Sequence, residues 1–315
     1  MNAPRRLVVI LGPTASGKSS LAIALAEKLG GEIVCCDSTQ VYRCFDIGTG
    51  KVPVEQQHGI PHHLTGLVDP EEVFTAGEYR RRALEVLGGV TERRKIPIIT
   101  AGTGLYLRAL LEGLADAPAR SETLRERLRQ SDALGGPRYL HRVLRRLDPE
   151  SASKIAPGDA QKLIRAIEIC LLAGKPASEL HRHGRVPLEG YSLVKIGLAP
   201  QRAALYMRID QRASLMLESG WLSEVDGLIK RNIPPTAKPF TFLGYSQLRE
   251  HLQGTKTIEQ ATREIQQATR RYAKRQITWL RRETAVHWFA GFGDEPGIVH
   301  AVLELLAATR ADFHT

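Results

Sequence analysis

Short apolar runs alternate with amphipathic segments in the first hundred residues. The runs Leu7–Leu11, Ile33–Cys36 and Ile96–Thr100 have the length and composition of buried strands. Helical spacing of apolar residues predicts helices over Lys18–Leu29, Ala76–Leu87 and Leu105–Leu111. Strands that alternate with helices indicate a parallel sheet in an α/β fold.

The pattern changes near Pro118 and becomes mainly helical. The residues that follow show short amphipathic stripes and little strand signal, until a strand-like stretch at Tyr191–Leu198. Residues 118–195 contain fifteen Lys and Arg against nine Asp and Glu. We therefore predict a basic helical insertion domain over 118–195, within a core formed by residues 1–117 and 196–315.

The last third also predicts helices, over 202–217, 224–231, 258–282 and 297–308, with a short strand at Trp288–Phe289. One of these helices is strongly basic: from Arg263 to Arg282, seven Lys and Arg stand against one acidic residue, Glu264. Exposed cations on a helix suit contact with nucleic-acid phosphates. Tyr272 and Trp279 lie among them and suit either base stacking or packing in the core, and the sequence leaves both open.

A phosphate-binding motif lies between the first strand and the first helix. Backbone N–H groups of this motif surround phosphates, and its lysine reaches a terminal phosphate. Its last hydroxyl, on Ser19, can bind Mg²⁺. The sheet is therefore expected to be a P-loop NTPase-like core with the helical insertion domain attached. The residues that match GxxxxGK[ST] are Gly12, Pro13, Thr14, Ala15, Ser16, Gly17, Lys18 and Ser19.

The motif accepts either a nucleoside triphosphate or a diphosphate. ATPases and GTPases of this fold hold the metal with an acidic residue from a further strand. Here the strand Ile96–Thr100 is followed by Ala101–Gly104 without an acidic residue, and Asp37 follows the second strand instead. This difference weakens the alternative of a small-molecule kinase or NTPase without excluding it.

Composition narrows the class of protein. The formal net charge of +10 favours a polyanionic or phosphorylated partner. The four cysteines, Cys35, Cys36, Cys44 and Cys170, have neither CxxC nor zinc spacing. No apolar run reaches about 20 residues, and the N-terminal residues do not follow a signal-peptide pattern. We expect a cytoplasmic protein that does not contact membranes and acts as a monomer.

Further motifs follow the P-loop in a fixed order: Asp37–Tyr42, Phe45–Lys51, Pro61–Leu64, Ala101–Tyr106, Arg165–Glu168, Gly244–Tyr245 and Thr269–Arg281. Together they resemble the bacterial tRNA dimethylallyltransferases of the tRNA isopentenyltransferase family, from about Leu7 to Trp288. Three positions depart from that family, which commonly has Met at Phe45, Ala at Gly50 and Gly at Ala101. None of these departures removes a group that the chemistry needs.

The resemblance implies a reaction between tRNA and dimethylallyl diphosphate. The exocyclic N6 amine of the adenine 3′-adjacent to the anticodon would take the dimethylallyl group, and diphosphate would be released. Asp37 is implied as the general base for this weakly nucleophilic amine. The alternative is that Asp37 only holds Mg²⁺ through water. The groups implied for the leaving diphosphate are Lys18, Thr103, Ser19 with Mg²⁺, and either Arg208 or Arg212.

The resemblance also implies which residues contact the tRNA. The reacting base must leave its stack, and the anticodon loop offers unstacked bases. The helical insertion domain is expected to grip the anticodon stem, mostly through phosphates. The implied tRNA contacts are Asp37, Ser38, Thr39, Gln40, Thr103, Arg125, Gln161, Lys162, Leu163, Ile164, Arg165, Thr241, Phe242, Leu243, Gly244, Tyr245, Ser246, Lys274, Arg275, Gln276, Ile277, Thr278, Trp279, Leu280 and Arg281.

Two other functions fit parts of the sequence. A P-loop kinase or NTPase shares the phosphate loop, Mg²⁺ and the sheet, but it would bind a nucleotide instead of dimethylallyl diphosphate. A non-catalytic RNA-binding protein would use the basic helix, but it leaves Lys18, Ser19 and Asp37 unexplained. His62 and His63 form no metal set, and a structural hydrogen-bonding role is the simpler interpretation.

Overall fold

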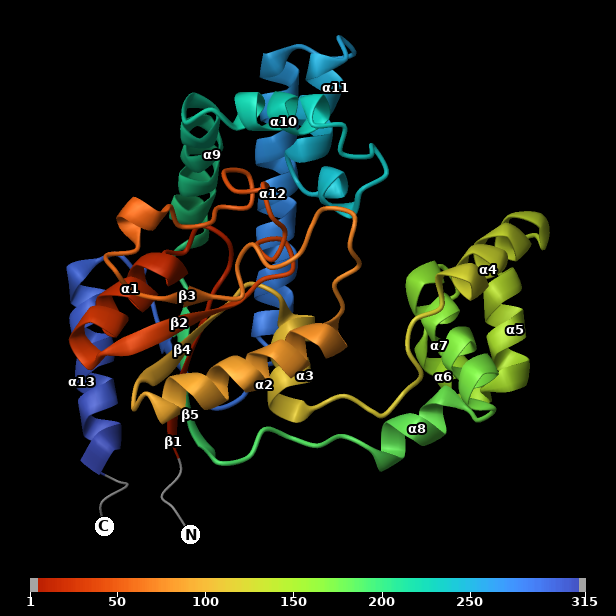
Figure 1. Ribbon diagram of the computed structural model, residues 1–315, viewed down its shortest axis with the longest axis horizontal. Coiled ribbons are helices and arrows are strands. Elements are labelled where there is room, and N and C mark those ends of the chain that lie inside the picture. Colours follow the sequence, from red (N-terminus) through yellow and green to blue (C-terminus); the bar gives the residue numbers. More distant parts are fainter. Residues whose placement is uncertain (1–4, 312–315) are drawn as a thin grey trace. The chain divides into compact units, whose positions relative to one another are not determined.

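Figure 1 shows the computed structural model, which describes residues 5–311. These residues form two compact units. The first contains the chain up to Leu110 and from Glu189 onward, and the second contains Leu111–Leu188. The helical segment therefore begins and ends earlier in the chain than the predicted insertion, 118–195.

The strands of the first unit run parallel in one sheet, in the order β3-β2-β4-β1-β5-β6. β5 pairs with β1 from Arg5↔Tyr191 to Leu11↔Gly197. The prediction that 191–195 belong to the helical insertion is therefore wrong, because the ladder with β1 already begins at Tyr191. The bounds of the strands are β1 Arg5–Leu11, β2 Gly31–Cys36, β3 His62–His63, β4 Ile96–Ala101, β5 Tyr191–Leu198 and β6 Val286–Phe289.

Most helices of the first unit lie where the apolar spacing predicts them. α11 and the two-residue strand β3 were not predicted, because neither is long enough to give a clear periodic signal. No helix in residues 5–311 is both long and apolar enough to cross a membrane. The helices are α1 Lys18–Leu29, α2 Ala76–Glu92, α3 Gly104–Glu112, α9 Arg202–Glu218, α10 Trp221–Lys230, α11 Tyr245–Leu252, α12 Ile258–Leu280 and α13 Pro296–Ala311, with 3₁₀ turns at Val54–Gln56 and Lys238–Thr241.

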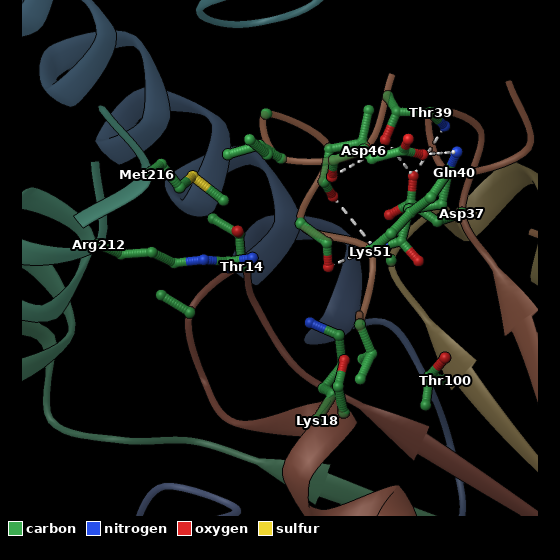
Figure 2. A pocket seen from close by; sticks show the side chains of 18 of the residues that line it. Thr14, Lys18, Asp37, Thr39, Gln40, Asp46, Lys51, Thr100, Arg212 and Met216 are labelled. Atoms are coloured by element: carbon green, nitrogen blue, oxygen red, sulfur yellow. Dashed lines mark hydrogen bonds and ion pairs between the residues drawn. The ribbon is translucent and has the colours of Figure 1, made fainter. Parts of the chain in front are cut away.

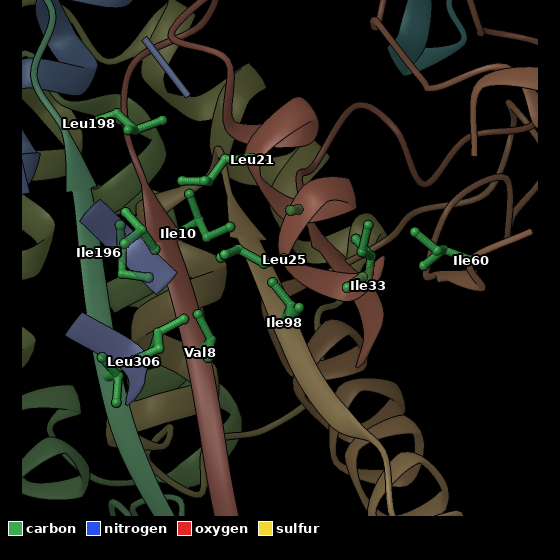
Figure 3. Close-up of a cluster of buried hydrophobic side chains, with 14 residues drawn as sticks. Val8, Ile10, Leu21, Leu25, Ile33, Ile60, Ile98, Ile196, Leu198 and Leu306 are labelled. Carbon is green, nitrogen blue, oxygen red and sulfur yellow. The ribbon is translucent and has the colours of Figure 1, made fainter. Parts of the chain in front are cut away.

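The core of the first unit lies against the central strands of the sheet. Val8 and Ile10 of β1 are fully buried in one cluster with Leu25 of α1 and Leu306 of α13 (Figure 3). Val9 points to the opposite face, because successive side chains of a strand alternate, and it is also fully buried. A parallel sheet covered on both faces presents its loops at the carboxyl ends of the strands, where such folds bind ligands.

The second unit consists of helices around a core of its own. Leu128, Leu144 and Ile167, from three of its helices, are buried in this core. Ser121 and Asp148 begin two of the helices, since their side-chain oxygens accept hydrogen bonds from the backbone three residues later. The helices are α4 Glu122–Leu134, α5 Tyr139–Leu147, α6 Pro149–Lys154, α7 Ala160–Ala173 and α8 Ala177–His183.

Candidate functional site

The P-loop connects β1 with α1 and surrounds a space with backbone N–H groups. Gly17 precedes α1 with φ 84°, a conformation that glycine adopts without strain. A Cβ at Gly17 would also lie 2.7 Å from the backbone nitrogen of Gly293. Within residues 5–311, the N–H groups of Ala15, Lys18 and Ser19 have no acceptor. Free N–H groups at the start of a helix bind anions, so this loop can hold phosphate.

Lys18 is folded against the loop that it follows. Its Nζ donates to the carbonyl oxygens of Gly12 at 2.9 Å and Pro13 at 2.8 Å. Burial lowers the pKa of Lys18 to about 8; the attraction of Asp37 opposes this shift, and repulsion from Arg212 adds to it. A carboxylate and a guanidinium therefore lie within electrostatic reach of the P-loop lysine.

Asp37 follows β2 at the carboxyl edge of the sheet. Its Oδ1 accepts hydrogen bonds from the Thr39 nitrogen at 2.8 Å and the Thr39 hydroxyl at 2.7 Å. Its Oδ2 lies so close to Gly102 that a Cβ there would collide with it. No hydrogen bond within residues 5–311 uses this second oxygen. One oxygen thus orients the carboxylate, and the other can take a proton.

The turn after β4 is bonded to the segment that carries Asp37. The backbone nitrogens of Gly102 and Thr103 donate to the Cys36 carbonyl at 3.0 and 3.1 Å. The Thr103 hydroxyl accepts from the Ser38 nitrogen at 3.0 Å. These bonds hold the ends of two neighbouring strands together and fix the position of Asp37.

The two candidate arginines of α9 have different partners. Arg208 donates two hydrogen bonds of 2.8 Å to the Asp294 carboxylate and lies 4.6 Å from the centre of the Phe292 ring. Arg212 forms no ion pair with a carboxylate in the described part of the chain, and its Nη2 approaches Gly50. Burial and repulsion from Arg208 lower the pKa of Arg212. Of the two, Arg212 is therefore the better placed to bind an anion.

A cavity of about 1610 Å³ in the first unit brings most of these groups together. Figure 2 shows Arg212 extending from α9 toward Thr14 of the P-loop, with Asp37 on the opposite side of the view and Lys18 below both. Thr103 does not line the cavity among the described residues, and its hydroxyl is bonded to the nitrogen and the hydroxyl of Ser38. The predicted site residues that line it are Thr14, Ala15, Ser16, Gly17, Lys18, Ser19, Asp37, Ser38, Thr39, Gln40, Arg208, Arg212, Thr241, Phe242, Leu243, Arg275 and Gln276.

Some residues implied for tRNA contact are instead buried in the first unit. Tyr245 is fully buried and donates its hydroxyl to Glu224 Oε1 at 2.6 Å; burial and this carboxylate raise the pKa of Tyr245. Leu280 is buried as well, and a Cβ at Gly104 would lie 2.9 Å from the Trp279 ring. Trp279 is half-buried and packs against Gly104, and its contact with tRNA stays a prediction. The exposed members of this group on α12 are Lys274, Arg275 and Thr278, with Arg281 directly after the helix.

In the second unit, too, some of the residues predicted to contact tRNA are buried and others are exposed. Leu163 and Ile164 are buried in the core of this unit, so the prediction that they contact tRNA is wrong for their side chains. Gln161 and Lys162 are exposed at the start of α7. An amphipathic helix carries both kinds of residue, and the family motif does not separate them.

In the second unit, a buried carboxylate binds two further residues that were predicted to contact tRNA. Glu168 is fully buried, accepts from Arg125 Nε and Nη2 at 2.8 and 2.7 Å, and accepts from Arg165 Nη1 at 2.6 Å. Burial alone would raise the pKa of Glu168, but the hydrogen bonds from Arg125, Arg165 and Ser121 outweigh it and hold the pKa at about 2. The side chains of Arg125 and Arg165 are 15% and 35% exposed, so Arg165 is the more accessible to phosphate.

Replacing Glu168 with alanine is expected to destabilise the second unit by about 3–5 kcal/mol, because it leaves two partly buried guanidinium groups without their carboxylate. Tryptophan fluorescence does not report on this unit, since all three Trp residues lie in the first one. Hydrogen exchange of α4 and α7 amides measures the effect. Glu126→Ala, which removes an exposed partner of Arg129, is the control and should cost less than about 1 kcal/mol. Equal protection in both variants would contradict a structural role for Glu168.

Glu224 is a residue of the site that the sequence did not identify. Its Oε2 accepts from the backbone nitrogens of Asp46 at 3.0 Å and Ile47 at 2.8 Å, and so fixes a loop that lines the cavity. The motif Phe45–Lys51 marks this loop as part of the family pattern. Nothing in the local sequence identifies its partner, because Glu224 lies 178 residues from Asp46.

Known proteins resemble this chain over nearly its whole length. A family model described as IPP transferase matches residues 40–283. The tRNA dimethylallyltransferase of Koribacter versatilis is 53% identical over 300 residues, which are 95% of this chain and 97% of that protein. The tRNA dimethylallyltransferase of Solibacter usitatus is 48% identical over 303 residues, covering 96% and 98%.

Two solved structures are similar in fold. A tRNA isopentenylpyrophosphate transferase from Bacillus halodurans has a TM-score of 0.72 and 34% identity, and the match covers 98% of both chains. A eukaryotic dimethylallyltransferase acting on tRNA has a TM-score of 0.79 and 27% identity, covering 91% of this chain and 74% of that one. Both matches agree with the predicted P-loop NTPase-like parallel sheet.

Proposed function

Since this chain belongs to the IPP transferase family, we propose that it transfers a dimethylallyl group from dimethylallyl diphosphate to the N6 amine of the adenine that follows the anticodon in tRNA. Its activity as a tRNA dimethylallyltransferase follows from the family; the acceptor atom and the position of the base are the proposed part. One observation carries the proposal: the phosphate loop and Asp37, which has one oxygen free, line the same cavity.

Asp37 is the proposed general base. The exocyclic amine of adenine is a poor nucleophile, because its lone pair is delocalised into the ring. As the bond from N6 to carbon 1 of the dimethylallyl group forms, Asp37 Oδ2 takes the N6 proton. The bond from carbon 1 to oxygen breaks, and its electron pair leaves with the diphosphate. The bonds from Thr39 occupy Oδ1 and support Oδ2 as the proton acceptor.

The P-loop is proposed to stabilise the negative charge that develops on the leaving diphosphate. Preorganised donors aimed at developing charge are usually the largest single source of catalysis. The free N–H groups of the loop and the Lys18 ammonium supply such donors. We assign Arg212 instead of Arg208 to the diphosphate, because Asp294 already binds Arg208. Thr103 would act through Ser38, by holding the segment that carries Asp37.

Mg²⁺ is proposed as the cofactor, with the Ser19 hydroxyl and diphosphate oxygens as its ligands. Ser19 lines the cavity, and its hydroxyl forms no hydrogen bond within residues 5–311, which suits a hard cation that prefers oxygen ligands. Mg²⁺ in such a site usually keeps several waters and binds substrate phosphates. When bound, it would neutralise part of the diphosphate charge.

The tRNA is proposed to reach the cavity along α12 and the residues before α11. Thr241, Phe242 and Leu243 line the cavity, and so does Arg275 of the basic helix. A base that reacts inside an enzyme must leave its stack, and a cavity lined by apolar and cationic groups suits an extruded base of a polyanion. The second unit, with its exposed cations, would hold the anticodon stem.

The test is incubation with Mg²⁺, labelled dimethylallyl diphosphate and unmodified tRNA, followed by nucleoside analysis. We expect an isopentenylated adenosine from the anticodon loop. Absence of this nucleoside, together with hydrolysis of ATP or transfer of its phosphate, would overturn the proposal in favour of the kinase or NTPase. A tRNA with the reacting adenine changed to guanosine is the control and should give no product.

Neutralising Lys274 and Arg275 together should weaken tRNA binding and reduce its dependence on salt. Both side chains are exposed on α12, and each phosphate contact changes the slope of log K against log salt by about 0.7–0.9. Loss of both contacts should therefore flatten the slope by about 1.5. Filter binding over a range of salt concentrations measures it. Neutralising Lys28 and Lys95, two exposed cations elsewhere in the first unit, is the control; equal slopes in both double variants would mean that Lys274 and Arg275 only face water.

A further inference from the structure

The loop that Glu224 binds forms one tight turn at the edge of the cavity. The Gly50 nitrogen donates to the Ile47 carbonyl at 2.9 Å, and the Lys51 nitrogen donates to the Asp46 carbonyl at 3.1 Å. Glu224 accepts from the nitrogens of Asp46 and Ile47, which begin the same turn. Because these bonds close the turn on itself, a shift of its first residues also shifts Gly50.

Helix α10 holds this turn to the rest of the first unit. Glu224 Oε1 accepts from the hydroxyl of the buried Tyr245, while Oε2 binds the turn. One helical turn earlier, the buried Trp221 lies so close to Gly48 that a Cβ there would collide with its ring. The two oxygens of Glu224 therefore connect the turn to the buried core.

The last residue of the turn lies against Arg212. The Nη2 of Arg212 occupies the space that a Cβ at Gly50 would fill. Among residues 5–311, no carboxylate or carbonyl oxygen accepts a hydrogen bond from this guanidinium. Its direction thus depends on the surfaces that it packs against, and the backbone of Gly50 is one of them.

Glu224 is one of two groups that hold the turn. Gln40 Nε2 donates to the carbonyl oxygens of Thr49 and Gly50 at 3.1 and 3.2 Å, so the last residues of the turn keep a partner when Glu224 is removed. Loss of Glu224 should therefore misplace Arg212 partly, and its effect should be smaller than the loss of Arg212 itself.

We propose that Glu224 is a positioning residue for the transfer reaction, which places the Arg212 guanidinium through the turn between them. The inference rests on the proposed function, because it takes Arg212 as a ligand of the leaving diphosphate. Glu224 touches neither substrate in this arrangement. It acts on the diphosphate only through Arg212.

Glu224→Ala should lower kcat/KM for dimethylallyl diphosphate about 10-fold, which corresponds to one weakened hydrogen bond from Arg212. Arg212→Ala should lower it about 10²- to 10³-fold, the usual effect of losing one donor to developing charge. Affinity for tRNA should be retained in Glu224→Ala. The matched control is Asp226→Ala, because Asp226 is a carboxylate of the same helix that pairs with the exposed Lys230.

Glu224→Gln separates the hydrogen bonds of Glu224 from its charge. The amide oxygen can accept from both nitrogens of the turn, and the amide nitrogen can donate to the Tyr245 hydroxyl oxygen. Glu224→Gln should therefore have a kcat/KM close to that of the native protein. A loss as large as in Glu224→Ala would overturn the inference, since the charge and not the turn would then be what matters.

A double-mutant cycle decides whether Glu224 acts through Arg212. Residues that act through one another give losses that do not add. In the Arg212→Ala background, Glu224→Ala should lower kcat/KM by much less than its 10-fold effect alone. Losses that add in the double variant would overturn the inference, because a merely structural role lowers activity equally in both backgrounds. Native kcat/KM in Glu224→Ala would overturn it as well.

If Glu224→Ala does not fold, the same cycle is measured with Glu224→Asp. Its side chain is one methylene shorter and cannot reach both the turn and Tyr245, so additive losses have the same meaning. The proposed function fails separately, if the native protein forms no isopentenylated adenosine. The cycle is then measured as calorimetric affinity for inorganic pyrophosphate, which needs no transfer, and additive losses of this affinity would overturn the inference by themselves.

Discussion

Replacement of Asp37 by alanine is expected to lower kcat about 10²- to 10⁴-fold, which is the usual contribution of a positioned general base. The affinities for tRNA and dimethylallyl diphosphate should change little, because Asp37 is proposed to bind neither phosphate nor the stem. Loss of its negative charge near Lys18 would favour an anionic ligand. Single-turnover formation of labelled product, with separate binding assays, measures both quantities.

The control for this result is Asp37→Asn, which keeps the shape of the side chain but cannot take a proton at neutral pH. Both variants should lose turnover to a similar extent. Turnover close to that of the native protein in either variant would show that Asp37 is not the general base. Recovery of turnover at raised Mg²⁺ concentration would instead assign Asp37 to the metal, the alternative that the sequence left open.

Replacement of Lys18 by alanine should lower kcat/KM for dimethylallyl diphosphate about 10²- to 10³-fold, the size of effect seen when one preorganised donor to developing charge is lost. Lys18 is the cation of the P-loop, and its Nζ already lies within the loop, at 2.8–2.9 Å from two carbonyl oxygens. Affinity for tRNA should be retained. Unchanged kinetics in dimethylallyl diphosphate would contradict the phosphate assignment of the loop.

The pH dependence gives Lys18 a second test. Burial lowers its pKa to about 8, so the free protein carries the charged ammonium below pH 8 and loses it above. Since kcat/KM reports the ionisation of the free enzyme, it should fall about tenfold per pH unit above about pH 8. Lys18→Arg keeps its charge at all these pH values and should not show this decline, although its kcat/KM is lower. A native profile that stays flat to pH 9.5 would mean that the charge of Lys18 is not required.

The local sequence was sufficient to predict the bounds of helices and strands that have a clear pattern of apolar residues. α1 has the bounds Lys18–Leu29 that its apolar spacing predicted, and β1 and β4 differ from prediction by two residues or fewer at each end. The P-loop and Asp37 were identified because a phosphate cradle and the end of a strand are encoded by neighbouring residues. The elements β3 and α11 were not predicted, because both are too short for a periodic pattern of apolar residues to be recognised.

Contacts between distant parts of the chain could not be predicted in this way. Glu168 binds Arg125, a predicted tRNA contact, in an ion pair across 43 residues of sequence. Asp294 binds Arg208 across 86 residues, and this bond is the reason that Arg212 is proposed as the ligand of the diphosphate, although both arginines line the cavity. Each of these pairs depends on side chains whose spacing carries no signal of proximity.

The sequence by itself was enough to predict the parallel α/β sheet, the phosphate loop, the position of Asp37 and the protein family. Each of these depends on short stretches of neighbouring residues. Only the tertiary structure decided which helices bury their polar residues, where the second unit ends and which groups line the cavity. Gln276 is the clearest case: it meets Thr14 over a separation of 262 residues. Sheet order and helix packing bring such residues together, and these depend on burial over the whole chain.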